Sequence, residues 1–470
     1  MPRRILLGLL ASAMIFPCYA AAPAEHNSHN PQIAAIVAAI SPQRIETRIR
    51  KLAAFHTRHT LSETASDSRG IGAARRWIKA ELELCSRAAG GRLQVTFDSY
   101  TQAANRRIPQ AVDIVNVVAI LPGTQAQASE RYYVVSGHYD SRATDVMDAV
   151  SAAPGANDDA SGVAAMMEMA CVMARQHFDA TLVFMAVAGE EQGLFGSTHW
   201  AEQAEKQGLQ VAGMITNDII GSSTADDGKV DSRSVRLFAN GLPALLAAQN
   251  SSAADGFALR ARTELKAMSQ SGGEFDTPTH QLGRYLKEIG ERYVPGFTVT
   301  LIPRPDRFLR GGDHLPFLQR GYAAVRFTEP AEDFRHQHQD IRKEQGVQYG
   351  DLPEFVDFAY VAQVTRVNAA GLASLALAPA APQDAGIEAN ELENDTTLRW
   401  RANSEPDLAG YRILWREPGA ALWQHARDVG NTTRTTLKGI SKDNFVFGVV
   451  ALDRDGNASP ASFPHLWRPN

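Results

Sequence analysis

The chain has 470 residues, of which 44% are hydrophobic and 21% are charged, and its formal net charge at pH 7 is -5. This length exceeds what one hydrophobic core usually organises, so we expect two domains, or one large domain with a small module. The composition is typical of soluble globular proteins, and the weak negative charge gives no reason to expect nucleic acid or a strongly anionic surface as a partner.

The N-terminal segment has the pattern of a secretory signal peptide. Arg3 and Arg4 precede an apolar run over residues 5–16, which is too short to span a membrane, and small residues suited to cleavage follow it. We expect residues 1–20 to be removed by cleavage near Ala20, which predicts a secreted or periplasmic protein. No other apolar run of the sequence is long enough to cross a bilayer.

Two cysteines, Cys85 and Cys171, remain after this cleavage. They permit one disulfide, but they exclude a framework of disulfides and a thiolate metal site. Cys171 lies in the apolar stretch 163–174, so a buried free thiol is an equally good interpretation.

The middle of the chain has the alternating pattern of an α/β domain. Residues 33–84 show helical apolar spacing, and we expect two helices there that flank the core. Strand-like apolar runs then alternate with helical segments, over residues 114–121, 132–136, 182–187, 211–216 and 322–327. This alternation predicts a mixed, largely parallel sheet flanked by helices, within a domain over residues 21–380. The segment 221–312 carries one clear helix that begins at Pro278, and we interpret the segment as an elaboration near the site.

The C-terminal segment changes to short alternating runs, after an Ala- and Pro-rich stretch at residues 378–382. These runs cover residues 397–400, 411–415 and 445–451, with turns between them. We therefore expect residues 381–470 to form a separate all-β sandwich. Trp400 and the stretches 406–411 and 449–457 resemble a fibronectin type III domain.

Residue types that bind divalent metals follow several of the apolar runs. They occur in Gly-His138-Tyr-Asp140, Asn-Asp158-Asp159-Ala-Ser-Gly, Gly-Glu190-Glu191 and Asn-Asp218. Ligands of open α/β sheets bind at the carboxyl ends of the strands, and hydrolytic sites with two metals need a carboxylate that can bridge them. We therefore expect a two-metal hydrolase site built from His138, Asp158, Glu191 and Asp218. A second histidine must come from later in the chain, and the candidates are His314, His336 and His338.

These motifs resemble, in order, those of the secreted dizinc aminopeptidases, relatives of bacterial leucyl aminopeptidase, glutamate carboxypeptidase II and glutaminyl cyclases. Gly312-Asp313-His314-Leu-Pro-Phe and His336-Gln-His-Gln-Asp340 extend the resemblance, which covers residues 33–375. It implies the phosphorylase/hydrolase-like zinc-peptidase fold and two Zn²⁺ ions. It also implies that Asp158 bridges the ions, that His138 and Asp218 complete one, and that Glu191 and His336 complete the other. His336 is favoured because it stands four residues before an Asp, as the family ligand does, and His338 is then a surface residue or lies beside a ligand.

The resemblance also assigns roles around the metals. Glu190 is the general base that takes a proton from the bridging water and returns it to the leaving amine. Asp140 accepts a hydrogen bond from His138 and fixes its tautomer. The peptide bond between Asp158 and Asp159 is expected to be cis.

The complete set of ligands and base predicts an exopeptidase that removes N-terminal residues from peptides. One alternative is a carboxypeptidase, for which Arg142, Arg310 or Arg335 could hold the substrate carboxylate. A second is a glutaminyl cyclase, which shares the 313–317 motif but uses one zinc. A binding protein without activity is the remaining alternative, and it would require ligands that are missing.

Overall fold

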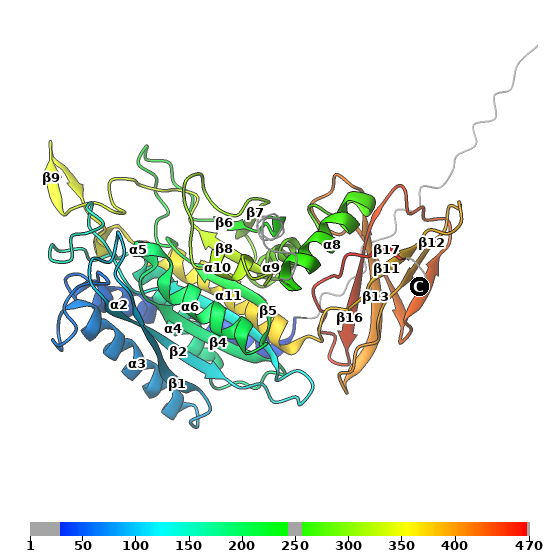
Figure 1. Ribbon diagram of the computed structural model, residues 1–470, viewed down its shortest axis with the longest axis horizontal. Coiled ribbons are helices and arrows are strands. Elements are labelled where there is room, and N and C mark those ends of the chain that lie inside the picture. The colour runs from blue at the N-terminus through cyan, green and yellow to red at the C-terminus, as the bar shows by residue number, and fades with distance from the viewer. Residues whose placement is uncertain (1–28, 243–255, 468–470) are drawn as a thin grey trace, which may run out of the picture.

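The computed structural model describes residues 29–242 and 256–467. The expected signal peptide at residues 1–20 lies outside the described residues. Figure 1 shows a large α/β part, which runs up to helix α11 (Phe358–Leu377), and a smaller β part beside it that is formed by the C-terminal residues.

One mixed sheet organises the large part. Its strands are β1 (Gln94–Gln102), β2 (Val112–Leu121), β3 (Arg131–His138), β4 (Thr181–Val187), β5 (Gln210–Asn217), β6 (Ser234–Phe238), β7 (Thr298–Ile302) and β8 (Ala324–Thr328). They pair in the order β1-β2-β4-β3-β5-β8-β6-β7. The pairs β3/β4, β3/β5, β5/β8 and β6/β7 are parallel, and β1/β2, β2/β4 and β6/β8 are antiparallel. The expected mixed, largely parallel sheet is confirmed.

Helices cover both faces of this sheet. One face packs against α1 (Pro31–Ala39), α2 (Pro42–Ala53), α3 (Gly70–Ala88), α4 (Ala160–Met173), α9 (Pro278–Tyr293) and α11, and the other against α6 (Phe195–Lys206) and α10 (Leu315–Leu318). Neighbouring residues of a strand point to opposite faces, so Val117 and Val135 join the first core and Val118 and Val134 join the second. Because both faces are covered, the central strands are continuous apolar runs.

The N-terminal helical region contains three helices rather than the two that we expected. A proline disfavours helical backbone in the residue before it, and Ser41 accordingly adopts extended backbone before Pro42. The side chain of Ser41 then accepts the N–H of Arg44 and caps α2. The helix that we expected at Pro278 is confirmed as α9, with Thr277 as its N-cap.

The segment 221–312 is more than an elaboration of the site. It supplies β6 and β7, which extend the sheet beyond β8, and it also contains α8 (Gly256–Ser271). A small hairpin of β9 (Arg342–Glu344) and β10 (Val347–Tyr349) projects from the end of the large part opposite the β part (Figure 1). A short 3₁₀ helix at Pro353–Phe355 precedes α11.

A disulfide links Cys85 of α3 with Cys171 of α4, across 86 residues of sequence. The structure thereby decides between the two interpretations that the sequence left open. The bond joins two helices that lie on the same face of the sheet.

The C-terminal part contains two sheets that enclose a core of its own. Its strands are β11 (Gly386–Glu388), β12 (Thr396–Arg399), β13 (Leu408–Arg416), β14 (His425–Gly430), β15 (Arg434–Leu437), β16 (Val446–Asp453) and β17 (His465–Trp467). They form the sheets β15-β12-β11-β17 and β14-β13-β16, in which every pair except β11/β17 is antiparallel. Trp400, Tyr411 and Phe447 are buried between them.

Buried ion pairs join the two parts. Asp276 accepts hydrogen bonds from Arg284 of α9 at 3.1 Å and from Arg416 of β13 at 2.6 Å. All three side chains are at most 5% exposed. Arg131 of β3 forms a second buried pair with Glu405 at 3.2 Å.

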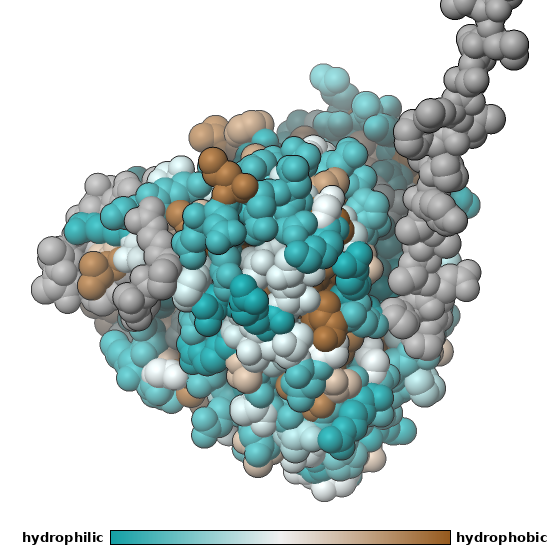
Figure 2. Space-filling view, turned by 90° about the vertical axis from the view of Figure 1, so that its right-hand side faces the viewer, coloured by the Kyte–Doolittle hydropathy of each residue, from teal (hydrophilic) through white to brown (hydrophobic). Residues whose placement is uncertain are grey.

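The surface on the C-terminal side is mostly hydrophilic, with small separate apolar areas (Figure 2). Among the described residues, no helix combines the length and the apolar character that a membrane span requires.

Candidate metal centre

The candidate ligands meet at the carboxyl ends of the central strands. His138 is the last residue of β3, Asp218 directly follows β5, and Glu191 lies in α5 (Glu190–Gly193) shortly after β4. Asp158 precedes α4, which packs against β3 and β5. Because β4, β3 and β5 are adjacent in the sheet, these four residues converge as the sequence predicts.

The first ligand group contains His138, Asp158 and Asp218. His138 Nε2 lies 3.0 Å from Asp158 Oδ1 and 3.9 Å from Asp218 Oδ1. All three residues are buried, and the imidazole Nε2 finds no hydrogen-bond partner among the described residues. A buried nitrogen between two carboxylates is a donor set that suits a zinc ion.

The second group contains Asp158, Glu191 and His338. His338 Nε2 lies 2.9 Å from Asp158 Oδ2 and 3.1 Å from Glu191 Oε1. Asp158 therefore presents one carboxylate oxygen to each group, as a carboxylate that bridges two metals must. The donors of both groups fit a pair of zinc ions.

The structure does not bring His336 into the second group, where we expected it. Its ring stacks on Phe355 with centroids 3.8 Å apart, and its Nε2 lies 3.6 Å from Asp333 Oδ2. His338 faces the site instead, from a backbone with a positive φ of 55° in the turn that carries both residues. The spacing to Asp340 could not reveal this turn. His314 is also excluded from both groups, because its Nε2 bonds to the carbonyl oxygen of Pro305 at 2.7 Å.

His138 is oriented by the main chain of Asp140. Its Nδ1 lies 3.1 Å from the Asp140 carbonyl oxygen and 3.6 Å from the carboxylate Oδ1. An Nδ1–H that donates to the carbonyl leaves the Nε2 lone pair free for a metal. The Asp140 carboxylate instead accepts the N–H groups of Glu190 and Glu191, at 3.3 and 3.1 Å. Asp140 thus holds α5 as well as the imidazole, and its carbonyl replaces the carboxylate that we expected beside Nδ1.

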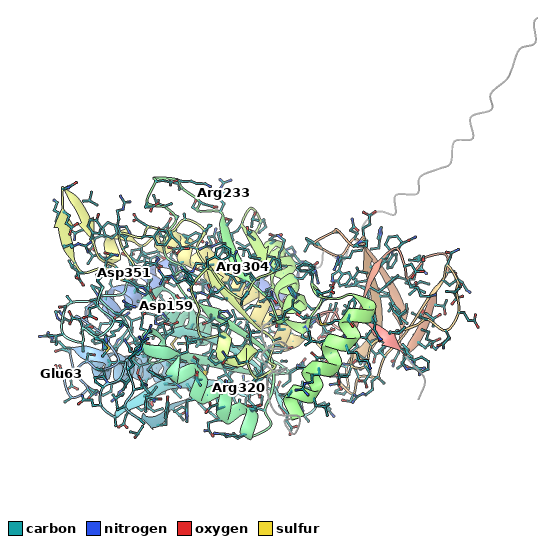
Figure 3. All side chains as sticks on the ribbon, turned by 45° about the horizontal axis from the view of Figure 1, so that its top comes forward. Glu63, Asp159, Arg233, Arg304, Arg320 and Asp351 are labelled. Atoms are coloured by element: carbon teal, nitrogen blue, oxygen red, sulfur yellow. A yellow bond between two sulfur atoms is a disulfide. The ribbon has the colours of Figure 1, made fainter. Side chains whose placement is uncertain are left out.

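The backbone around Asp158 is fixed by two further carboxylates, both labelled in Figure 3. Asp351 accepts the N–H of Asp158 at 2.7 Å, and Asp159 accepts the N–H of His138 at 3.0 Å. Asp159 also accepts the N–H of Gly162 at 2.9 Å and so caps α4. The peptide bond between Asp158 and Asp159 is cis, as expected. Gly162 is required here because a Cβ would lie 2.2 Å from the carbonyl oxygen of Asn217.

Arg326 is a site residue that our sequence analysis missed. It is 1% exposed, and its guanidinium contacts Asp218 Oδ2 at 2.9 Å and Asp306 Oδ2 at 2.7 Å. It therefore orients the free oxygen of a candidate ligand. The available signal was a charged residue within the otherwise apolar strand β8.

The concentration of acidic groups shifts the titration of the site. Burial lowers the pKa of His338, but Glu191 and Asp158 outweigh it and raise the pKa to about 10. Burial raises the pKa of Glu190 well above its usual value, and the negative charges of Asp218 and Glu191 add to this shift. Excess negative charge of this kind favours the binding of divalent cations in place of protons.

An open cavity of about 270 Å³ lies over both ligand groups. Glu190, which we expect to be the general base, lines it. Leu194, Ile219 and Leu309 also line it, and all three have a positive φ between 58° and 59°. Such backbone is strained in residues with bulky side chains, and strain of this kind is concentrated at functional sites.

Comparisons with known proteins agree with this geometry. Residues 116–352 match the model of peptidase family M28. The chain is 46% identical over 433 residues to a probable zinc metalloprotease of Leptosphaeria maculans, covering 92% of this chain and 96% of the relative. A probable zinc metalloprotease of Pyricularia oryzae is 46% identical over 430 residues, covering 90% and 82%.

Solved structures share the fold at low sequence identity. LapB of Legionella pneumophila aligns with a TM-score of 0.50 at 16% identity, covering 74% of this chain and 76% of that one. An aminopeptidase from Aneurinibacillus sp. strain AM-1 aligns with a TM-score of 0.50 at 13% identity, covering 73% and 96%.

Proposed function

Because the chain belongs to peptidase family M28, we propose that it is an exopeptidase with two zinc ions that removes N-terminal residues from peptides. The observation that carries this proposal is Asp158, whose two carboxylate oxygens face two separate groups of ligands. His138 and Asp218 would hold one zinc ion with Asp158, and Glu191 and His338 would hold the other.

The residues around the cavity divide the work of hydrolysis. Bound zinc would polarise the scissile carbonyl and lower the pKa of water. Glu190 takes the proton of the attacking water and returns it to the leaving amine, which is the role of a general base that becomes a general acid. Asp140 fixes the start of α5 through the two N–H groups that it accepts, and so holds Glu190 in place. Arg326 holds Asp218 in its orientation.

We propose further that residues 1–20 direct secretion and are removed. An aminopeptidase is favoured over a glutaminyl cyclase because the candidate metal ligands form two groups, whereas a glutaminyl cyclase would need only one zinc ion. A carboxypeptidase remains the second candidate, since arginines line the cavity.

Replacing Glu190 by Gln tests the proposed base. We expect the Glu190→Gln variant to keep two zinc ions per chain and to lose about 100-fold or more in kcat, in the range for general acid–base catalysis. Glu46, which is half-buried, pairs with its helix neighbour Arg50 and does not line the cavity, so Glu46→Gln provides the matched control. Wild-type turnover by the Glu190→Gln variant would exclude Glu190 as the base.

The choice of substrate end is tested with peptides and aminoacyl-anilides that carry either a free or an acetylated N-terminus. An aminopeptidase cleaves only the free amines. Equal cleavage of the acetylated peptides, which keep a free C-terminus, would contradict this assignment and favour the carboxypeptidase. One zinc ion per chain with cyclisation of N-terminal glutamine would favour the cyclase.

A further inference from the structure

Several arginines line the cavity over the candidate metal ligands. The five are Arg107, Arg142, Arg307, Arg310 and Arg326. Two are neutralised, because Arg326 pairs with Asp218 and Asp306, and Arg307 pairs with Glu332. Because they form ion pairs within the protein, Arg326 and Arg307 are not available to bind a substrate.

The other three arginines have no carboxylate within 4.0 Å among the described residues, and their hydrogen bonds go to uncharged groups. Arg107 Nη1 donates to the carbonyl oxygen of Glu191 at 3.1 Å. Arg142 donates to the carbonyl oxygens of Ala143 and Thr144, at 3.1 and 2.7 Å. These bonds orient the guanidinium groups but leave their positive charges uncompensated.

Arg310 has a weaker tie to the protein. Its Nη1 lies 3.4 Å from His338 Nδ1, which must accept for the contact to be a hydrogen bond. When His338 uses the Nε2 lone pair for a metal, Nδ1 of the neutral ring carries the proton and cannot accept. Metal binding at Nε2 therefore leaves Arg310 without this acceptor, and its exposed side chain can bind another group.

With two divalent cations bound, the lining of the cavity would carry an excess of positive charge. Its lining carboxylates are those of Asp158, Glu190, Glu191 and Asp218. Two divalent cations would offset these four charges, and the three arginines would then remain in excess. The arginines also come from three separate segments, namely the β1–β2 connection, the loop after β3 and the loop before α10. Their convergence at one cavity is thus a product of the fold rather than of one basic run.

We propose that Arg107, Arg142 and Arg310 bind a carboxylate of the substrate. This inference rests on the proposed peptidase function and defines its substrate class as short or acidic peptides. Guanidinium groups match the planar carboxylate with paired hydrogen bonds. The carboxylate is either the free C-terminus of a short peptide or the side chain of Asp or Glu next to the scissile bond.

Three matched pairs of substrates distinguish these sources. Leu-Gly against Leu-Gly-amide tests the C-terminal carboxylate, Leu-Glu-amide against Leu-Gln-amide tests the residue after the scissile bond, and Glu-Gly-amide against Gln-Gly-amide tests the residue before it. We expect the zinc-loaded enzyme to prefer the charged member of at least one pair by about tenfold or more in kcat/KM, since hydrogen bonds between charged groups are strong. The preference is expected to shrink as ionic strength rises, because Arg107 and Arg310 are exposed and Arg142 is only half-buried.

Variants of the arginines test whether these residues cause the preference for charged substrates. The triple replacement of Arg107, Arg142 and Arg310 by Gln is expected to abolish the preference by raising KM for the charged member of the pair, so that the ratio within that pair falls to about one. Arg106→Gln is the matched control, because this neighbour of Arg107 does not line the cavity. It should leave every ratio unchanged.

Binding provides a readout that is independent of turnover. Calorimetric titration of the zinc-loaded Glu190→Gln variant with each peptide should show the same preference in Kd. Ratios within twofold for all three pairs, in kcat/KM and in Kd, would overturn the carboxylate proposal while leaving peptidase activity intact. An absence of hydrolysis of every peptide by the wild type would instead contradict the proposed function.

Discussion

Replacing His338 by Ala tests which histidine binds the second zinc ion. The structure assigns His338 to that site, whereas the sequence favoured His336. The replacement removes the only nitrogen donor of that group and leaves the carboxylates of Asp158 and Glu191. His336→Ala is the matched control, because it lies two residues earlier in the same turn and its ring stacks on Phe355. Only the first replacement is expected to affect zinc binding.

The magnitude follows from the contacts of His338. Its Nε2 lies 2.9 and 3.1 Å from the two carboxylates, so it would share the same ion with them. Loss of a residue that merely supports a ligand weakens metal binding by about 10- to 100-fold, so we expect loss of the ligand itself to weaken the second zinc by about 100-fold or more. The two remaining carboxylates would also repel each other when no cation lies between them.

Zinc is counted per chain after equilibration in buffers of fixed free zinc concentration. We expect two ions in the wild type and in the His336→Ala variant, and one in the His338→Ala variant at zinc concentrations that saturate the wild type. The His336→Ala variant should lose only about 0.5–1.5 kcal/mol of stability with its ring contact. Thermal unfolding of each metal-free variant controls for misfolding. Loss of one zinc by the His336→Ala variant, with two retained by the His338→Ala variant, would refute our reasoning.

Three further predictions concern stability. Arg416→Met removes a partner of the buried Asp276, so it should lower the free energy of unfolding by about 3 kcal/mol in urea titrations; a loss below about 1 kcal/mol would contradict a role of this pair in holding the two parts together. Burial raises the pKa of Glu168, but two arginines of α2 outweigh it and lower the pKa below its usual 4.5, so the stabilisation is present above about pH 4.5 and is lost as the pH falls through the lowered value. The stability advantage of the wild type over Glu168→Gln should therefore shrink on acidification below pH 4.5, and an advantage that grows would be inconsistent with the sign of this shift. Joint replacement of Cys85 and Cys171 by Ser should cost about 2–5 kcal/mol, because their bond closes a long loop, and an unchanged melting temperature would show that the bond does not stabilise the fold.

Apolar runs predicted the strands that are buried on both faces. The runs 182–187 and 211–216 lie within β4 and β5, and both extend almost the full length of these strands. β1 was missed because it is a largely exposed edge strand whose sequence alternates polar and apolar residues only weakly. β6 and β7 were missed because they are short and lie in a segment that we interpreted as an elaboration.

The sequence by itself determined which residue types end each central strand, and therefore that His138, Asp158, Glu191 and Asp218 approach one another. This information is local, since His138, Glu191 and Asp218 lie at the end of a strand or shortly after it, Asp158 lies just before α4, and the apolar patterns of these strands and of α4 can be recognised. Only the tertiary structure shows that His338, rather than His336, faces the second group of ligands. The choice depends on how the turn that carries both histidines is oriented toward Glu191, and His338 lies 147 residues after Glu191 in the sequence. Tertiary structure also determines that Arg107, Arg142 and Arg310 line one cavity. Three loops meet there because of the order of strands in the sheet, and non-local packing, rather than any local pattern, sets that order.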